Sequence, residues 1–203
     1  MVKDDIDMTE RTKPLKLLSK EIFSGAPLYS TEKMEEGADG LPLINIKDVA
    51  EGTIRPDTCR RLIPGDFKNL ARYLVYPKDV VVTCRGSLLK AAVIPENIGK
   101  ALITSNLIAV RLDELVLPEF LAIYLNIKEG QRKILTSATS ADTRLVLTVS
   151  NIEEFEIPVL PINLQKQIID LTASSVEQYR LSLDAAVTRK KITEQIIEEL
   201  IKK

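Results

Sequence analysis

One short segment of the sequence, Ser87-Leu88-Leu89-Lys90, has the residue types and spacing of a catalytic pair. It matches the S-x-x-K pattern, in which a serine nucleophile lies three residues before a lysine. In enzymes that use the pattern it opens a helix, whereas here a β-branched run precedes it and a second apolar run, AAVI, follows it. No K-T-G or S-D-N segment accompanies it. An enzyme that uses Ser87 and Lys90 is therefore the least favoured of three hypotheses.

The composition excludes several other kinds of active site. The 203 residues contain no histidine, the most common general base and metal ligand. Cys59 and Cys84 are the only cysteines, too few for a zinc site on their own or for a secreted disulfide framework. Glycine-rich phosphate loops are absent, and paired carboxylates fall where solvated faces are expected. We predict a non-catalytic protein with free thiols, no metal and no cofactor of its own.

Arg85, Gly86 and Ser87 are better suited to binding a nucleic acid. They place a long cation, a flexible residue and a hydroxyl after a predicted strand, and a guanidinium there can reach phosphate or guanine O6 and N7. Residues 45–111 carry 11 basic and 6 acidic side chains, although the chain has a net charge of −1. The candidate DNA-binding residues lie in this basic region and in a polar loop at 137–144: Arg85, Ser87, Lys90, Lys47, Arg55, Arg60, Arg61, Lys68, Arg72, Thr143 and Arg144.

The pattern of apolar runs and breaks predicts a mixed, β-rich domain that would position these side chains. Residues 1–13 are expected to form a flexible tail. Polar or Gly/Pro-containing stretches predict loops at 24–27, 35–40 and 137–143. β-rich runs predict strands at 41–49, 79–84, 91–94, 101–112 (with a bulge near Ser105 and Asn106), 145–149 and 155–160. A helix is expected from Pro118 to a stop at Gly130.

The last segment, residues 162–203, contains neither proline nor glycine and predicts one long helix. A continuous helix of this length would extend ~60 Å. A heptad pattern of alternating steps of three and four runs from Ile169 to Leu200, with polar exceptions at Thr172, Lys190 and Thr193. We expect its apolar positions to form a dimer interface: Ile169, Val176, Tyr179, Leu183, Ala186, Ile197 and Leu200. The alternative is that this helix folds back on its own domain.

Taken in order, the segments resemble the specificity subunits (HsdS) of type I restriction-modification systems. The resemblance rests on IFSGAPL, LPLINIKDVAEGTI, KDVVVTCRGS, SNLIAVRL, LPEFLAIYLNIKEGQ and the junction NIEEFEIPVLPINLQKQI, and it covers nearly the whole chain from about Leu15. A full member of the family has two target recognition domains and two spacer helices. This chain has room for one of each and shows no internal repeat. It therefore resembles a half-length subunit, with a recognition domain at 1–161 and a spacer helix at 162–203.

The resemblance implies an α+β fold, a β-rich recognition domain followed by one coiled-coil helix. It also implies sequence-specific binding of double-stranded DNA in the major groove and no catalysis. In the family, S-adenosylmethionine belongs to the methyltransferase subunits, and ATP and Mg²⁺ belong to the restriction subunits that join through them. A half-length chain would have to dimerise, with itself or with a second specificity chain. A homodimer with antiparallel helices would read an interrupted palindrome.

Two further expectations concern location and the competing hypothesis. The acidic, polar N-terminus is not a signal peptide, and no stretch approaches 18 consecutive apolar residues, so we expect a cytoplasmic protein without membrane contact. The main alternative function is a coiled-coil interaction module without DNA binding. In that case the basic region would be solvated surface and the long helix a docking device.

Overall fold

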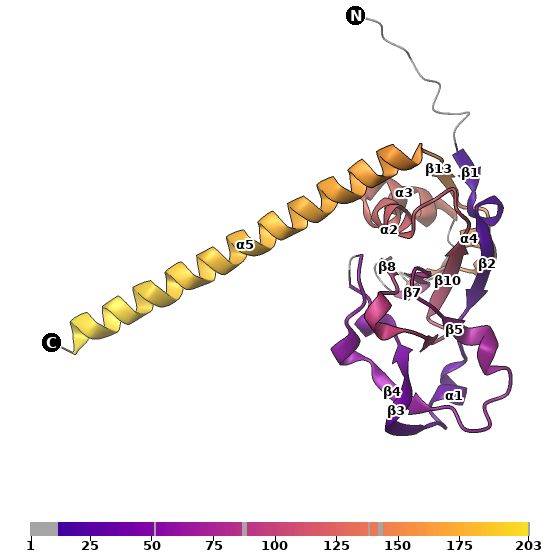
Figure 1. Cartoon of the computed structure of the whole chain (residues 1–203), viewed down its shortest axis with the longest axis horizontal. Coiled ribbons are helices and arrows are strands. Elements are labelled where there is room, and N and C mark those ends of the chain that lie inside the picture. The colour runs from indigo at the N-terminus through magenta and orange to yellow at the C-terminus, as the bar shows by residue number, and fades with distance from the viewer. Residues whose placement is uncertain (1–11, 51, 87–88, 138, 142–143, 203) are drawn as a thin grey trace, which may run out of the picture. The chain divides into compact units, whose positions relative to one another are not determined.

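The computed structural model describes residues 12–50, 52–86, 89–137, 139–141 and 144–202. By its internal contacts the chain divides into two compact units, Met1–Gln165 and Lys166–Lys203. Figure 1 traces both units along the chain, and they are treated separately below. Among its described residues the first unit is mixed, with four small sheets and four short α-helices, and the second belongs to one long helix. The expected α+β fold class is confirmed.

The central sheet has four antiparallel strands in the order β2-β10-β6-β8. These are β2 (Ser19–Ser24), β10 (Leu107–Leu112), β6 (Val80–Thr83) and β8 (Ala91–Val93). Every residue of β6 is buried, as its run of valines predicts for a strand covered on both faces. The strands expected at 79–84 and 91–94 are therefore confirmed.

A second, mixed sheet has the order β4-β3-β9-β5. Its strands are β4 (Arg60–Ile63), β3 (Glu35–Ile44), β9 (Ala101–Ile103) and β5 (Leu74–Val75), and β3 runs parallel to β9. The loop expected at 35–40 is wrong, because these residues extend β3 as a mostly exposed strand with a register shift between Glu36 and Leu41. In this part of β3 the described pairing is with β4 alone, whereas β9 pairs with Leu43 and Ile44, and the resulting exposure explains the polar composition.

The strand expected over 101–112 is in fact two strands that belong to different sheets. β9 lies in the mixed sheet and β10 in the central sheet, and Thr104 to Asn106 connect them. Because the two strands cross between sheets, their side chains contribute to one core cluster, which includes Ile44, Val81, Ile103 and Leu107. The break near Ser105 and Asn106 is therefore a sheet crossover and not a bulge.

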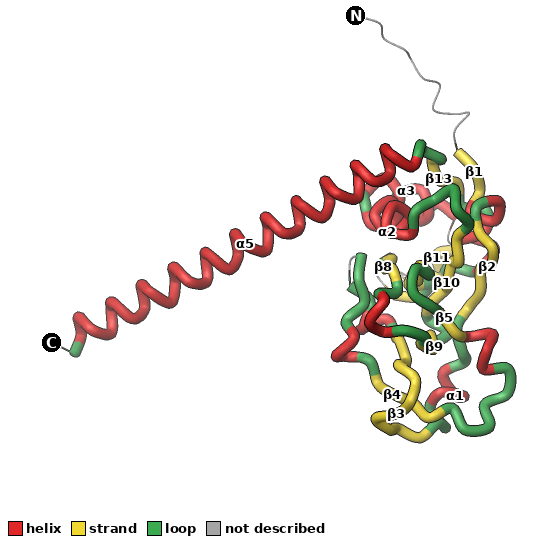
Figure 2. The backbone as a smooth tube through the Cα atoms, in the orientation of Figure 1, coloured by secondary structure: helices red, strands yellow, loops and turns green. Residues whose placement is uncertain are grey.

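Two helices pack at the end of the first unit opposite β3 and β4 (Figure 2). α2 (Pro118–Asn126) begins with proline in its first turn, as expected, and contacts β8. Gly130 does not stop this helix: α2 ends at Asn126, and Gly130 lies inside α3 (Lys128–Ser137). A Cβ atom at Gly130 would collide with the carbonyl of Tyr124, so glycine is needed for close approach of α3 to the end of α2.

Two smaller sheets complete the first unit. β11 (Thr139–Ala141), β12 (Arg144–Val146) and β7 (Arg85–Gly86) form an antiparallel sheet, so the loop expected at 137–143 is wrong at least for β11. β1 (Thr12–Pro14) pairs with β13 (Glu156–Pro158), so the flexible tail expected at 1–13 is wrong for Thr12 and Lys13. Short helices α1 (Leu28–Thr31) and α4 (Val149–Glu153) lie between strands, and Thr148 caps α4 with its hydroxyl.

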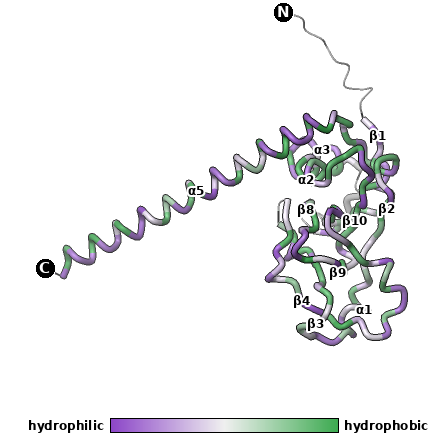
Figure 3. Tube along the Cα trace, in the orientation of Figure 1, coloured by the Kyte–Doolittle hydropathy of each residue, from purple (hydrophilic) through white to green (hydrophobic). Residues whose placement is uncertain are grey.

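α5 (Ile162–Ile201) is one uninterrupted helix of 40 residues, as its composition predicts. Its first turn belongs to the first unit through the buried side chain of Gln165. The Gln165 amide accepts a hydrogen bond from Leu117 N–H (2.8 Å) and donates to the carbonyls of Leu115 (3.0 Å) and Leu160 (2.8 Å). Figure 3 shows hydrophobic and hydrophilic residues alternating along the whole helix. Among the described residues, no helix is long and apolar enough to cross a membrane.

Candidate nucleic-acid interface

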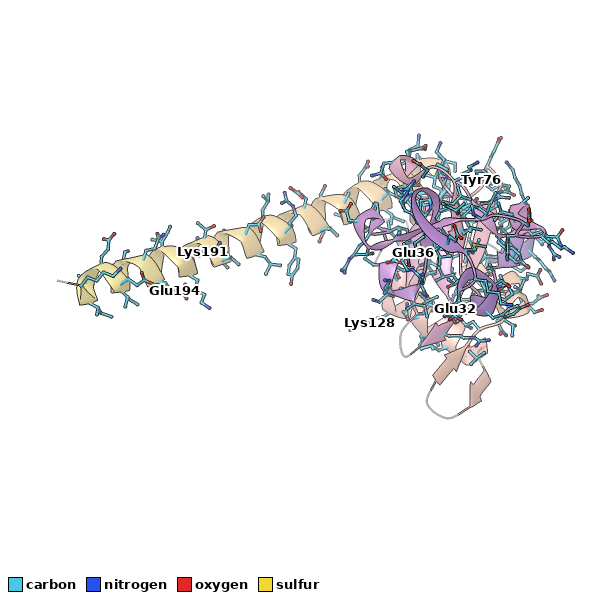
Figure 4. All side chains as sticks on the ribbon, turned by 90° about the horizontal axis from the view of Figure 1, so that it is seen from below. Glu32, Glu36, Tyr76, Lys128, Lys191 and Glu194 are labelled. Atoms are coloured by element: carbon cyan, nitrogen blue, oxygen red, sulfur yellow. The ribbon has the colours of Figure 1, made fainter. Side chains whose placement is uncertain are left out.

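The small sheet β11-β12-β7 joins two segments that are separate candidates in the sequence. Arg85 and Gly86 form β7, and β12 pairs with them so that Val146 lies opposite Arg85 and Leu145 lies opposite Gly86. Gly86 has a φ angle of +133°, which favours glycine. In Figure 4 the β11–β12 hairpin projects from the body of the first unit. The structure thus brings Arg85 next to the segment that contains Thr143 and Arg144.

The sheet β11-β12-β7 is called the ribbon below, and buried residues hold its base. Cys84, between β6 and β7, donates its N–H to the Asn106 carbonyl (2.9 Å), and its own carbonyl accepts from Leu147 N–H (2.9 Å). Cys84 and Leu147 are buried, and burial raises the pKa of the Cys84 thiol, an effect that nearby Arg85 partly opposes. Side chains alternate between the two faces along a strand, so Arg85 and Val146 point away from the core while the side chains of Cys84 and Leu147 point into it. Both are exposed.

The other end of the 85–90 segment is held by α2 and α3. The Asn126 amide accepts from Ala91 N–H (3.0 Å) and donates to the Ala91 carbonyl (2.8 Å), as a neighbouring strand would. The Gln131 amide donates to the Leu89 carbonyl (3.1 Å). Lys90 N–H donates to the Thr83 hydroxyl (2.9 Å), and the Lys90 carbonyl accepts from Thr83 N–H (2.9 Å). The backbone that carries Lys90 is therefore fixed on both sides.

Lys47 and Arg55 flank a tight turn that contacts β8, the strand after Lys90. Gly52 donates its N–H to the Ala91 carbonyl (3.0 Å), and its carbonyl accepts from Val93 N–H (3.4 Å). The φ angle of Gly52 is +81°, so this turn also favours glycine. Lys47 and Arg55 are exposed on either side of it. Thus Gly52, in the turn between these two cations, contacts β8, the strand that directly follows Lys90.

The remaining basic candidates lie on other elements. Arg60, on β4, pairs with Glu36 (2.6 Å), and Arg61 donates from Nε to the Ala38 carbonyl (2.8 Å), so both bind within the β3–β4 pair. Lys68 and Arg72 are exposed in the segment between β4 and β5. No described contact links these four residues to Arg85 or Lys90, and they form at most a separate basic surface.

The aromatic side chains of the basic region pack locally. The Phe67 and Tyr73 rings are 5.8 Å apart and, with Tyr29, line an open cleft of about 690 Å³ between α1 and the end of β4. The Tyr76 ring lies 5.3 Å from the Arg111 guanidinium. Neither of these two ring contacts involves Arg85.

Three of the candidate residues lie wholly or partly outside the described residues. Ser87 and Thr143 lie outside the described residues, and for Arg144 only the backbone, in β12, is described. The catalytic hypothesis for Ser87 and Lys90 loses its structural basis even so, because Lys90 leads directly into β8 and not into a helix. Across the described part of the chain, no group of three or more Cys, Asp or Glu residues is placed to hold a metal ion.

The predicted dimer residues all lie on α5, in a part of the helix where apolar side chains are widely exposed. Val176, Tyr179, Leu183, Ile197 and Leu200 are each about half exposed or more. Further exposed apolar residues lie off this stripe: Leu171, Leu181, Val187, Ile192, Ile196 and Ile201. The apolar surface of α5 is therefore wider than the heptad stripe alone.

Sequence reasoning missed the residues that hold the far end of the 85–90 segment, and it missed Val146. Asn126 and Gln131 are ordinary polar residues of an amphipathic helix until the structure shows their backbone partners. Val146 lies within the strand expected at 145–149, but only the pairing of β12 with β7 places it beside Arg85. No sequence signal short of the strand register could have identified it.

Comparisons with known proteins rest on structure alone. No protein-family model matches the chain, and no curated protein matches its sequence. Its structure is similar to a chain from a study of complex assembly and conformational transition in a type I restriction-modification system (TM-score 0.60, 20% identity), covering 87% of this chain and 40% of that one. It is also similar to the HsdS subunit of Thermoanaerobacter tengcongensis (TM-score 0.58, 19% identity), covering 83% and 37%.

A third similar structure is the type I restriction-modification S subunit of M. genitalium (TM-score 0.52, 18% identity), with 82% of this chain and 38% of that one covered. The chain thus spans about two fifths of the length of the proteins it matches. Over that length it has the fold of type I restriction-modification specificity subunits, as the resemblance in its sequence predicts.

Proposed function

We propose that the chain is a non-catalytic specificity subunit that reads a DNA sequence for a type I restriction-modification system. The observation that carries this proposal is the shared fold, which spans more than four fifths of the chain in three structures from such systems. In this role the chain positions adenine-N6 methyltransferase subunits, and through them restriction subunits, on a bipartite target. S-adenosylmethionine, ATP and Mg²⁺ are bound by those partners and not by this chain.

The ribbon β11-β12-β7 supports DNA binding by its shape and charge. The major groove of B-DNA is about 12 Å wide and accepts a two-stranded β-ribbon. Arg85 is exposed on β7, Lys90 directly precedes β8, and Lys47 and Arg55 are exposed on either side of the turn whose Gly52 contacts β8. No described carboxylate pairs with any of these four cations. They are therefore available for phosphate and base contacts.

The exposed apolar stripe of α5 supports a homodimer formed by two antiparallel helices. In a parallel pair Lys190 would face Lys190 of the second copy, and like charges inside an interface are destabilising. In an antiparallel pair centred between Asp184 and Ala185, Lys190 faces Tyr179 of the second copy, and Leu183 faces its Ala186. This register also overlaps the whole stripe from Ile169 to Leu200, so it buries more apolar surface than a pair shifted by one heptad.

Such a dimer would carry two identical recognition domains related by a two-fold axis. It would then read two inverted copies of one half-site, an interrupted palindrome. Half-sites on one face of DNA recur about every 34–36 Å, and a helix of 40 residues is ~60 Å long. The helix pair is therefore long enough to separate the two domains by such a distance.

One observation favours a second candidate function, an interaction module without DNA binding. The exposed apolar residues of α5 extend beyond the heptad stripe, to Leu171, Leu181 and Ile192 among others. Surface of this kind marks contacts with other proteins. A docking module would need this surface and would not need the ribbon.

The test is selection from a randomised duplex library at about 0.15 M salt, which is the physiological ionic strength. The full chain is used alone and with methyltransferase subunits of a type I system. We expect an interrupted palindrome to be enriched, and Arg85→Ala to weaken binding of the selected duplex roughly 5-fold or more. The matched control Arg132→Ala removes an exposed arginine of α3 that pairs with Glu129, and binding should not change. Enrichment of no sequence under either condition would favour the interaction module.

A further inference from the structure

Val146 is an exposed apolar residue on the ribbon, directly across from Arg85. Its exposed fraction is 37%, whereas that of the next residue, Leu147, is 4%. The two strands are antiparallel, and Val146 and Arg85 are paired residues in their register. Opposite side chains in such a pair lie on the same face of the sheet, with Cβ atoms about 4.5–5.5 Å apart. Val146 and Arg85 therefore emerge side by side.

The backbone beneath this pair is fixed. Cys84 and Leu147 are buried, joined by a hydrogen bond of 2.9 Å, and Cys84 is bound in turn to Asn106. The pair is thus the first exposed layer above a held base, and little backbone entropy would be lost when it binds a ligand.

The two side chains match two features of the major-groove floor. A guanidinium can donate two hydrogen bonds to O6 and N7 of guanine, and a small apolar group can pack against the C5-methyl group of thymine. Successive base pairs are about 3.4 Å apart. Side chains whose Cβ atoms are about 5 Å apart can therefore reach neighbouring base pairs, with the longer arginine spanning the extra distance.

We propose that Arg85 and Val146 act as one base-reading pair, in which Arg85 binds a guanine and Val146 contacts the methyl group of a thymine in the adjacent base pair. This inference rests on the proposed DNA-binding function and adds the chemistry of one recognised step. Val146 is then a specificity-determining residue, and its contribution is to base preference more than to overall affinity.

The experiment removes single groups from the selected duplex and from the full chain. Deoxyuridine in place of the thymidine removes only the methyl group, and wild-type affinity should fall about fourfold. Val146→Ala should bind the thymidine and deoxyuridine duplexes equally. 7-Deazaguanine in place of the guanine removes N7, and wild-type affinity should fall roughly 5-fold or more. Arg85→Ala should not distinguish guanine from 7-deazaguanine.

Ile63→Ala is the matched control, because Ile63 is an exposed apolar residue of β4, which belongs to a different sheet from Arg85. It should keep the full wild-type response to both base changes. If Val146→Ala keeps the thymidine preference, or if the selected site has no guanine next to a thymine-containing base pair, the inference is wrong while the proposed function stands. A wild-type chain that selects no sequence would overturn both.

Discussion

Arg111 and Asp79 form a two-pronged ion pair between adjacent strands of the central sheet. Arg111 Nε lies 3.0 Å from Asp79 Oδ1, and its Nη2 lies 2.8 Å from Oδ2. Asp79 is almost fully buried, and its Oδ2 also accepts from Tyr76 N–H (2.9 Å). The guanidinium lies between the Phe23 and Tyr76 rings, 5.6 and 5.3 Å from their centroids. This network ties β10 to the start of β6, the strand that leads into the ribbon.

We expect Asp79→Ala to lower the free energy of unfolding by about 3–5 kcal/mol. Removal of Asp79 takes away the buried carboxylate that binds Arg111 through two hydrogen bonds, and it leaves Tyr76 N–H without this acceptor. Arg111 would keep Glu21 (2.6 Å), but Glu21 is half exposed and binds weakly in comparison. Glu21→Ala is therefore the control, with an expected loss below about 1 kcal/mol. Urea unfolding followed by circular dichroism measures both, and equal effects would show that burial of Asp79 is not the dominant cause.

The Asn126 side chain supplies a second test, of how firmly α2 holds β8, the strand that follows Lys90. Asn126→Ala removes both hydrogen bonds to Ala91, which leaves a backbone N–H and carbonyl with fewer partners. We expect a loss of about 1–3 kcal/mol in unfolding free energy and weaker binding of the selected duplex. Asn163→Ala, at an exposed position of α5, should change stability by less than about 0.5 kcal/mol. Unchanged unfolding of Asn126→Ala would mean that these bonds do not hold the strand.

The sequence predicted most accurately the elements whose pattern has one physical reading. The valines of β6 are buried on both faces, and the proline- and glycine-free run of α5 can hardly be anything but helix. Glu35 to Gly40 were misread because an exposed strand segment that pairs on one side only has the composition of a loop. Gly130 was misread because the sequence does not distinguish a glycine required by a close contact between helices from a glycine that ends a helix.

The candidate site was predicted in part, for a related reason. Arg85 and the 137–144 segment were identified by residue type, but only the pairing of β7 with β12 brings them together. The basic residues Arg60 and Arg61 were identified by the same rule and lie on a different sheet. Residue type shows what a side chain can bind, whereas register and sheet order decide which side chains act on one ligand.

The chemistry of Cys59 gives a prediction about pH. Burial, with a smaller contribution from Asp48, raises the pKa of the Cys59 thiol from 9.0 to about 11. Because only the thiolate reacts, alkylation by iodoacetamide at pH 8 should be roughly 100-fold slower in the folded chain than in the same chain unfolded in urea. The folded-state rate should rise about tenfold per pH unit until the pH approaches 11. Peptide mapping by mass spectrometry separates Cys59 from Cys84, and rapid labelling of folded Cys59 at pH 8 would contradict the prediction.

The last prediction concerns the α5 stripe. Leu183→Asp places a charge at the centre of the proposed antiparallel interface, opposite Ala186 of the second copy. Desolvation of an unpaired carboxylate costs several kcal/mol, and the two-fold axis would repeat it, so the mass measured by light scattering should fall from dimer to monomer. Leu181→Asp is a matched control, because Leu181 is exposed to a similar degree (55% against 48%) but lies off the stripe. It should leave the dimer intact. Equal dissociation by both variants would mean that the apolar surface acts as a whole and not through a heptad stripe, and a monomeric wild-type chain would remove the basis for an interrupted palindrome.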